Sequence, residues 1–459
     1  MEPPSFSSGG RMVFRVAFPV PGTWKWQAGD GRSGEVRVAQ YSGNNPLYRH
    51  GFLKVADSKR YLAHSDGTPF LWMGDTAWFG GSKATPEEWR DYIADRVAKG
   101  FSVVQISAVR GPASPGVLKP FQADGTPNAA YWDNIDSKVR HANERGIVIL
   151  MVGLGRPTAP SDEPFVARPE FARYVAARFY GDHVMFSPNF DGMYVPLFDT
   201  VAENLRSSTA IHLIAQHPGT RKGQNEIYVP KPYLDFSALQ SGHHSGRLEA
   251  AYTAAREWPL NLWSMTPVKP VINIEAMYDG RGSDEGTGWR GKDVRKLGWI
   301  SWLSGALGYT YGAGETDRKV PGSNGGVWGW NQTESTWDHW RNAATWPSSS
   351  QMKVLREFFG SLPWWRLQPA HDAVLEGGVA ATDRAVFAVT PDGSVAVAYT
   401  PVRQKIMLNL EQFASPMTAT WIDPRDGSRR KLPGTVSGGS HTFNPPESGE
   451  DWALLLQRR

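Results

Sequence analysis

Two carboxylates in this sequence each follow a short apolar run that has the composition of a buried strand. Glu275 ends the run PVINIE (270–275), and Asp191 follows the run HVMFSPNF (183–190). Because a glutamate seldom ends a buried apolar strand unpaired, Glu275 indicates a point where a strand emerges from the core. Two carboxylates across one opening are the groups with which glycosidases hold an acid and a nucleophile around one anomeric carbon. Asp191 by itself could also be a turn residue before Gly192.

Further polar and aromatic side chains lie in the expected strands, after their ends, where parallel α/β folds place their chemistry, or in the Trp-rich loop 324–340. We expect these side chains to contact a sugar by hydrogen bonding or by ring stacking. The set comprises Asp75, Trp78, Gln105, Asn189, His217, Gln240, His243, Tyr278, Tyr311, Trp328 and Trp330. Asp75 could instead cap the segment that follows it, which is the commoner role of an aspartate after a strand.

Histidines in this set raise the alternative of a metal site. His217, His243 and His244 with Asp191 are suitable ligand types. However, QSGHHSG (240–246) lacks the i, i+4 spacing of a helical zinc site. Hydrogen bonding to sugar hydroxyls is the better interpretation, so we expect neither a metal nor a cofactor.

Repeated strand–helix units are expected to position these residues. Apolar runs alternate with helical patterns from about residue 47 to 365, which is typical of βα units. The eight expected strands cover 69–74, 102–109, 147–153, 183–190, 211–216, 234–240, 270–275 and 307–312. Thr85 and Pro86 predict the start of the first long helix, and Gly100 its end. Eight such units predict an α/β fold, a (β/α)₈ TIM barrel over residues 43–368.

Short alternating strands flank the expected barrel on both sides. Residues 1–42 read as part of an antiparallel β-domain, because three short strands do not make an independent sandwich. Residues 369–459 read as a C-terminal β-sandwich, with turns at Asp392-Gly393 and Asp426-Gly427. The sequence therefore predicts three segments, of which the barrel carries the chemistry.

Composition limits the function further. The chain of 459 residues has no cysteine, which excludes disulfides and cysteine nucleophiles, and its net charge of +4 comes without a basic patch that would indicate nucleic-acid binding. No stretch reaches the roughly 18 apolar residues of a membrane span. Neither a P-loop nor a G-x-S-x-G elbow occurs, so nucleotide hydrolysis and serine-hydrolase chemistry lack their central motifs. The 20 Trp, 15 Tyr and 20 Phe suit core packing and also stacking under sugar rings.

Six motifs in order along the chain resemble the apiosidase-like glycoside hydrolases, a (β/α)₈ family that acts on plant cell-wall pectin. They are GDTAW, VAKGFSVVQ, HLIAQHP, LDFSALQSGH, PVINIEAMYDG and GALGYTYG. The C-terminal TATWIDPRDG and FNPPESGEDWALLL are similar to the β-sandwich that follows this barrel and carries a collagen-binding name, which is not evidence that it binds collagen. FPVPGTWKW resembles the end of a β-domain that often precedes the barrel.

The resemblance implies that Asp191 and Glu275 are the catalytic residues. We expect Glu275 to attack the anomeric carbon, and Asp191 to protonate the leaving oxygen and later to activate water. Many relatives carry Gly-Gly-Asp before the acid, whereas this chain has Asn189-Phe190-Asp191. Phe190 could narrow the pocket and raise the pKa of the acid by excluding water, or it could only pack in the barrel core. The resemblance also relates Asn189 to the asparagine that contacts the substrate 2-hydroxyl in broader retaining barrel glycosidases.

We therefore expect a retaining, exo-acting glycosidase that releases a terminal apiose-like or other furanose sugar from a pectic polysaccharide. An endo-acting glycanase is the alternative within enzymes, with the Trp-rich loop 324–340 lining an open cleft. A carbohydrate-binding barrel without catalysis is the alternative from another class, although it would have no reason to pair two acids. The expected partner is an oligosaccharide or polysaccharide, with no nucleic acid and no membrane, and the oligomeric state is left open. We expect a bacterial periplasmic or secreted protein whose signal peptide is not in this chain; absence of cysteine also fits the cytoplasm.

Overall fold

A parallel sheet forms the centre of the molecule in the computed structural model, which describes residues 5–458 apart from 9, 19, 110–116, 158–159, 222, 243–247, 282–290, 316–324 and 414. Seven strands pair side by side around the sheet. Their order is β10 (Val184–Ser187), β9 (Val148–Val152), β8 (Val103–Ser107), β7 (Trp72–Thr76), β13 (Gly308–Tyr311), β12 (Val271–Glu275) and β11 (Ser237–Gln240). The expected (β/α)₈ barrel is confirmed, with one strand position formed differently.

The expected strand at 211–216 is that position. The structure has a single bridge there, between Phe186 and Ile214. The Ile214 N–H donates to the Asp235 carboxylate (2.6 Å), while its carbonyl accepts from the Asp235 N–H (2.9 Å). Because a side chain takes the place of a ladder hydrogen bond, the segment closes the barrel between β10 and β11 without becoming a regular strand.

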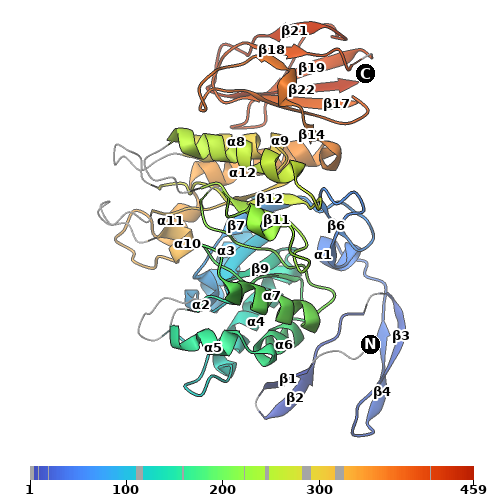
Figure 1. Ribbon diagram of the computed structural model, residues 1–459, viewed down its shortest axis with the longest axis vertical. Helices are drawn as coiled ribbons and strands as arrows, with labels where there is room; N and C mark the ends of the chain where they lie inside the picture. The colour runs from blue at the N-terminus through green and yellow to red at the C-terminus, as the bar shows by residue number, and fades with distance from the viewer. Residues whose placement is uncertain are drawn as a thin grey trace.

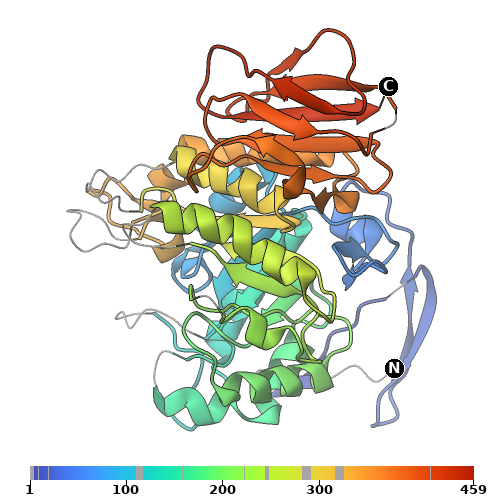
Figure 2. The same ribbon diagram turned by 45° about the horizontal axis from the view of Figure 1, so that its top comes forward.

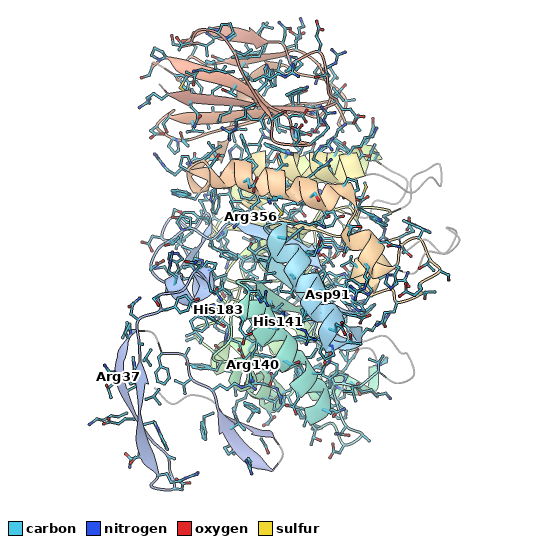
Figure 3. The ribbon with its side chains drawn as sticks, turned by 180° about the vertical axis from the view of Figure 1, so that it is seen from behind. Arg37, Asp91, Arg140, His141, His183 and Arg356 are labelled. Atoms are coloured by element: carbon cyan, nitrogen blue, oxygen red, sulfur yellow. The ribbon has the colours of Figure 1, made fainter. Side chains whose placement is uncertain are left out.

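Helices cover the outside of the barrel, and a second apolar layer fills its inside. The longer helices are α3 (Pro86–Ala98), α4 (Ala129–Glu144), α6 (Pro169–Arg178), α7 (Pro196–Ser208), α8 (Leu248–Ser264), α9 (Gly291–Leu303) and α12 (Pro347–Gly360). Short helices are α1 (Pro46–His50), α2 (Gly80–Lys83), α5 (Glu163–Val166), α10 (Gly326–Gly329) and α11 (Trp340–Ala344). Figure 3 shows α3, with Asp91, beside α4, with Arg140 and His141, on the outer surface.

The first long helix begins where the sequence predicts. Thr85 caps α3 in a capping box, in which its hydroxyl accepts from the Glu88 N–H and the Glu88 carboxylate accepts from the Thr85 N–H. Pro86 occupies the first turn, where its missing N–H is not needed. Thr85 and Pro86 therefore predict the start of α3 because one satisfies free backbone N–H groups and the other needs no N–H there.

Strand residues alternate between the two layers. Trp72, Val103 and Ile272 belong to the apolar cluster inside the barrel, whereas Met73 and Val104 belong to the cluster beneath the helices. A residue's position in this alternation decides whether its side chain can reach the barrel interior.

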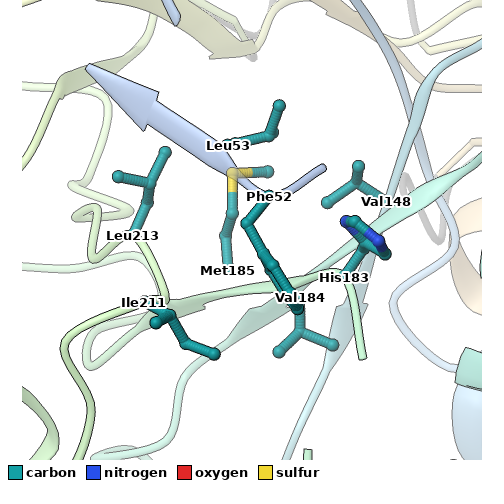
Figure 4. Close-up of a pocket in the computed structure, with 8 residues that line it drawn as sticks. All are labelled: Phe52, Leu53, Val148, His183, Val184, Met185, Ile211 and Leu213. Carbon is teal, nitrogen blue, oxygen red and sulfur yellow. The ribbon is translucent and has the colours of Figure 1, made fainter. Parts of the chain in front are cut away.

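A small apolar pocket lies at the end of the barrel where the strands begin, and Figure 4 shows it in close-up. Its volume is about 10 Å³, and its lining includes Val148 and Val184, which are the first residues of β9 and β10. Phe52 stacks on His183 at 4.6 Å, and burial lowers the pKa of His183 to about 3. This space is too small for a sugar, so the opposite end carries the candidate site.

Two small antiparallel sheets form the N-terminal segment, made by β1 (Ser5–Ser8) with β2 (Arg11–Phe14) and by β3 (Gly22–Gln27) with β4 (Ser33–Val38). Arg15 fastens this segment to the barrel through Asp136 of α4 and the Arg178 carbonyl. The β3–β4 hairpin stands apart from the barrel (Figure 1), and Figure 3 shows its Arg37 side chain pointing away from it. A further hairpin, β5 (Leu53–Val55) with β6 (Leu62–His64), leads into the barrel.

The C-terminal β-sandwich packs on the barrel, as Figures 1 and 2 show. One sheet contains β14 (Gln368–Pro369), β16 (Val386–Val389), β17 (Val395–Thr400), β22 (Trp452–Arg458), β19 (Met417–Ile422) and β20 (Arg429–Lys431). The other contains β15 (Val374–Glu376), β18 (Ile406–Asn409) and β21 (Ser440–Phe443). Tyr399 of the first sheet stacks on Trp299 of α9 at 5.6 Å, within one apolar cluster that spans both domains.

A buried ion pair fixes this interface. Arg295 of α9 donates two hydrogen bonds to Asp451 (2.7 and 3.1 Å), and the Tyr399 hydroxyl donates a third to the same carboxylate (2.7 Å). The side chains of Arg295 and Asp451 are only 3% and 0% exposed. Removal of one partner would leave the other charge buried and uncompensated.

We expect Asp451→Ala to lower the free energy of unfolding by about 3–5 kcal/mol, because Arg295 then loses its counter-ion inside the interface. Urea denaturation measures the change. Glu450→Ala is the matched control, since its pair with Lys292 is exposed and should contribute no more than about 0.5 kcal/mol. Equal small losses in both variants would contradict a role for the buried pair.

Candidate active site

Glu275 faces the barrel mouth because β12 contains a bulge. Leu239 pairs with Asn273, but the next residue, Gln240, pairs with Glu275, so Ile274 is an extra residue. Strict alternation would turn Glu275 outward, since Asn273 reaches Ser301 of α9 on the outside. The bulge reverses that direction, and bulges commonly re-aim side chains beside active sites.

Asp191 reaches the same mouth from a tight turn after β10. Its backbone adopts a left-handed conformation (φ 53°), which is uncommon for a residue with a side chain. Arg156 holds this turn by donating to the carbonyls of Phe190 and Asp191, and Gly219 donates to the Gly192 carbonyl. The Asp191 side chain remains 41% exposed. Its carboxylate is thus held in place and still accessible from outside.

His217 lies between the two carboxylates. Its Nε2 is 2.9 Å from Glu275 Oε2, and its Nδ1 is 3.7 Å from Asp191 Oδ1. One ligand atom from each of the three residues lies within 4.8 Å of the other two. The imidazole is fully buried, so it acts as a fixed spacer between one exposed and one buried acid.

Aromatic side chains enclose this trio. The Phe190 ring stacks on His217 (5.5 Å, 19°), and Trp78 meets His217 edge-on at 5.1 Å. Trp78 donates to the Tyr278 hydroxyl (2.9 Å), and Tyr278 in turn hydrogen-bonds to Glu275. The structure therefore brings together five of the expected residues: Trp78, Asp191, His217, Glu275 and Tyr278.

Burial and charge shift two pKa values in this cluster. Burial alone would lower the pKa of His217, but the hydrogen bond and charge of Glu275 and the charge of Asp191 outweigh it and raise the pKa above 6.5. Burial and the neighbouring Glu275 raise the pKa of Tyr278 well above 10. The acids therefore favour the charged form of His217 more than water does, although its Nδ1 also lies 3.5 Å from the Asp191 N–H, and Tyr278 stays a neutral hydrogen-bond donor.

Phe190 packs in the core rather than at the pocket surface. It is 5% exposed and belongs to the apolar cluster inside the barrel, with its ring against His217 and Gly153. Of the two roles considered for Phe190, packing is where the structure places it, and the ring orients His217.

Asn189 and Gln105 lie inside the barrel top with their amides engaged by the protein. Asn189 Oδ1 accepts from the His217 N–H (2.6 Å), which ties the Asp191 turn to the segment before His217, and its Nδ2 donates to Tyr228 (3.2 Å). Gln105 donates to Thr76 and to the Ile274 carbonyl beside the bulge. Both side chains support the mouth from beneath.

Three expected substrate contacts lie elsewhere. Asp75 is completely buried on the outer side of β7, where it accepts from Tyr92 (2.5 Å) and pairs with Arg96 (2.9 Å). Tyr311 also points outward, to Ser348 of α12. Trp330 is buried against Trp340. The expectation that these residues contact substrate is wrong, because strand alternation turns Asp75 and Tyr311 toward the helices and a ring stack covers Trp330.

Two of the remaining expected residues can be placed at the mouth. Gln240 ends β11 and lines a pocket beside Asp191, and Trp328 of α10 lies partly buried with its ring 6.4 Å from Tyr278. His243 lies outside the described residues, as does His244.

A pocket of about 360 Å³ opens next to Asp191. We call it the Asp191 pocket. Its lining residues are Asp191, Gly192, Met193, Gly219, Thr220, Arg221, Gln224, Gln240 and Arg281. Sequence reasoning missed Thr220, Arg221, Gln224 and Arg281, although each follows an expected strand, in HPGTRKGQ or in YDGR.

The trio could also be considered as metal ligands, since Asp191, His217 and Glu275 are the right residue types at close range. However, His217 contacts the two acids through opposite ring nitrogens, and Nε2 is already 2.9 Å from Glu275. A single ion would have to displace this direct contact. Acid–base chemistry requires no such displacement.

We expect Glu275→Gln to lower the pKa of His217, because the charge and hydrogen bond that raise it are lost while burial remains. Histidine-selective ¹⁵N NMR across a pH series measures the shift, with His441 of the sandwich as internal control. The linkage sign follows: because the pKa is raised on folding, the stability from this charge is present below pH ~6.5 and is lost as pH rises through the raised pKa. An unchanged His217 titration would contradict the assigned pair.

Two models of known protein families match the chain. The family model of the apiosidase-like catalytic domain matches residues 56–366, and that of a "putative collagen-binding domain of a collagenase" matches residues 369–457. No curated protein matches the chain.

Solved structures share the fold at low sequence identity. A glycoside hydrolase family 5 protein from Bacteroides vulgatus is 22% identical over 92% of this chain and 96% of its own, with a TM-score of 0.78. A family 5 mannosidase from Rhizomucor miehei is 12% identical over 68% of this chain and 98% of its own, with a TM-score of 0.50. Together with the match to the catalytic-domain model, these findings show that the chain belongs to the apiosidase-like family and is a glycoside hydrolase.

Proposed function

We propose that this glycoside hydrolase acts with retention of configuration, with Glu275 as nucleophile and Asp191 as acid and base. The observation that carries the proposal is the carboxylate spacing. The paired oxygens of Asp191 and Glu275 lie within 4.8 Å. This is close to the roughly 5–5.5 Å of retaining enzymes and short of the roughly 6.5–9.5 Å that an inverting enzyme needs to fit a water.

The environments of the two acids suit different roles. Glu275 is 3% exposed and contacts the His217 imidazole, whose raised pKa favours a positive charge beside it. An ionised, desolvated carboxylate next to a fixed cation is suited to attack the anomeric carbon. Asp191 is accessible, so it can protonate the leaving oxygen and later take a proton from the incoming water.

We propose exo action on a pectic polysaccharide, with release of a terminal furanose-type sugar such as apiose. Membership of the apiosidase-like family supports the substrate class. A pocket of about 360 Å³ is at the small end of the range for ligand sites, which supports binding of one or two sugar units rather than a long chain. Such a polymer occurs outside the cytoplasm, which supports a periplasmic or secreted location. No helix in the described part of the chain has the length and apolar character needed to cross a membrane.

The test is a product screen on pectic fractions, with Glu275→Ala as control. We expect the wild-type enzyme to release one monosaccharide and the variant to release none. Oligosaccharide products would favour the endo-acting alternative, and release by both proteins would point to a contaminant. ¹H NMR of the first anomer formed tests retention, and initial inversion would overturn the nucleophile assignment for Glu275.

The roles should separate on mutation. Glu275→Gln should abolish turnover on every substrate, because no covalent intermediate can form. Asp191→Asn should keep part of its activity on aryl glycosides with good leaving groups, since these need little protonation. Rates on two aryl glycosides of different leaving-group pKa measure the difference, and equal losses on both would contradict the acid assignment.

A further inference from the structure

A buried lysine of α4 is aimed at the segment that carries Trp78. Lys138 is 2% exposed. Its ammonium donates to the carbonyls of Gly80 (3.3 Å), Gly81 (2.8 Å) and Ala84 (2.6 Å), which matches the three N–H donors of the group. These carbonyls belong to α2 and to the residue that ends it. Lys138 therefore binds this short helix through carbonyls at its end, where backbone acceptors need partners from outside the helix.

A second donor on the same face of α4 points to the same helix. Asn134, one turn before Lys138, donates from Nδ2 to the Gly81 carbonyl (3.1 Å). Close packing restricts α2 from another side, since a Cβ atom at Gly80 would lie 2.8 Å from the Trp330 ring. The position of α2 is thus set by α4 on one side and by an aromatic ring on another.

The helix α2 begins two residues after Trp78, so its position determines where Trp78 lies. The Gly80 N–H donates to the Ala77 carbonyl (2.9 Å), and the Lys83 N–H donates to the Phe79 carbonyl (2.8 Å). These hydrogen bonds join the helix to the residues on both sides of Trp78. A displacement of α2 therefore displaces the indole as well.

Trp78 connects α2 to the acids. Its indole N–H donates to the Tyr278 hydroxyl (2.9 Å), and its ring lies 5.1 Å from the His217 ring. Tyr278 and His217 both contact Glu275. An error in the position of Trp78 is therefore transmitted to the two groups that hold the Glu275 carboxylate.

A second aromatic residue of the mouth is tied to the same helix. The Phe79 N–H donates to the Trp328 carbonyl (3.2 Å), and Lys83 Nζ donates to the Gly329 carbonyl (2.8 Å). The position of α2 thus affects Trp328 of α10 as well as Trp78.

We propose that Lys138 is a positioning residue for glycoside hydrolysis: its ammonium fixes α2, and α2 fixes Trp78 against the groups that contact Glu275. The inference rests on the proposed function for the role of Glu275 as nucleophile. A charge is costly to bury, and an apolar side chain of similar length would fill the same space without that cost. Such a side chain has no donors to hold the carbonyls of α2. Because α4 lies on the outer surface of the barrel (Figure 3), Lys138 acts on the site from behind.

Hydrogen exchange of the Trp78 indole N–H tests this positioning without turnover. Its ¹⁵N–¹H NMR signal is assigned by its loss in Trp78→Phe. Spectra are recorded at pH 6, where Lys138 is charged because burial lowers its pKa only to about 7. In full-length Lys138→Met we expect this N–H to exchange about 10- to 100-fold faster than in the wild type. The Trp452 indole of the sandwich, which donates to the Ser448 carbonyl, is the internal reference and should keep its rate.

Lys99→Met is the matched control. Lys99 also donates from its ammonium to a carbonyl at the end of a short helix, that of Ala344 in α11 (2.7 Å). The Trp78 exchange rate should therefore stay at its wild-type value in this variant. Lys138→Gln is a second test variant, because its amide has two donors for three carbonyls and should also release α2. An unchanged Trp78 rate in both Lys138 variants, or an equal increase in Lys99→Met, would overturn the inference whatever the product screen shows.

A double-mutant cycle relates the position of Trp78 to catalysis. We expect Lys138→Met to lower kcat by about 10- to 100-fold, as a misplaced catalytic group does. Addition of Trp78→Phe should lower kcat little further, because both substitutions break the same path to Glu275. Losses that multiply fully would overturn this path. Faster exchange of the indole with an unchanged kcat would overturn the positioning role even if the product screen and the retention test succeed.

Discussion

The active-site geometry depends on one buried imidazole that contacts two acids. His217 Nε2 meets Glu275 at 2.9 Å and Nδ1 approaches Asp191 at 3.7 Å, so the ring sets the distance between the two carboxylates. Its backbone N–H donates to Asn189, and Phe190 stacks on its face. Desolvation of a carboxylate is costly, and the raised pKa of His217 favours a positive charge beside Glu275 that offsets part of that cost. The turn after β10 and the segment before His217 are therefore joined at the point where the acids must meet.

Much of this arrangement can be predicted from the sequence, because the signals are local. Apolar runs located seven strand positions, and Thr85 with Pro86 located the start of α3. The sequence also indicated Glu275 as a site residue, because β12 ends on this acid and a buried carboxylate requires a partner. The segment at 211–216 looks like a strand by composition, but its pairing with the Asp235 side chain depends on a residue 21 positions away from Ile214.

Composition alone could not predict the direction in which each strand side chain points. Asp75 and Glu275 both end strands of the same sheet, yet one faces α3 and the other faces the mouth. Alternation along β7, counted from its apolar residues, turns the Asp75 side chain outward. The sequence therefore contained the information needed to exclude Asp75 from the barrel mouth. The same rule applied to β12 would also have turned Glu275 outward, and only the pairing register reveals the bulge that reverses it. Arg221 and Arg281 were missed because they follow their strands in loops, where no periodicity indicates which side chains converge.

The position of His217 also fits both halves of the proposed reaction cycle. Before attack, the negative charge is on Glu275, and the imidazolium lies against it through Nε2. When Glu275 forms the glycosyl bond its charge disappears, while Asp191 gives up its proton to the leaving oxygen and becomes charged on the Nδ1 side. The imidazolium therefore keeps one negative neighbour throughout, and only the ring edge that faces it changes. A planar ring with a nitrogen on each edge reaches both acids without moving. The net charge around the ring therefore stays constant through the proposed cycle. This is a physical reason for placing a histidine, enclosed by Trp78 and Phe190, between an acid and a nucleophile.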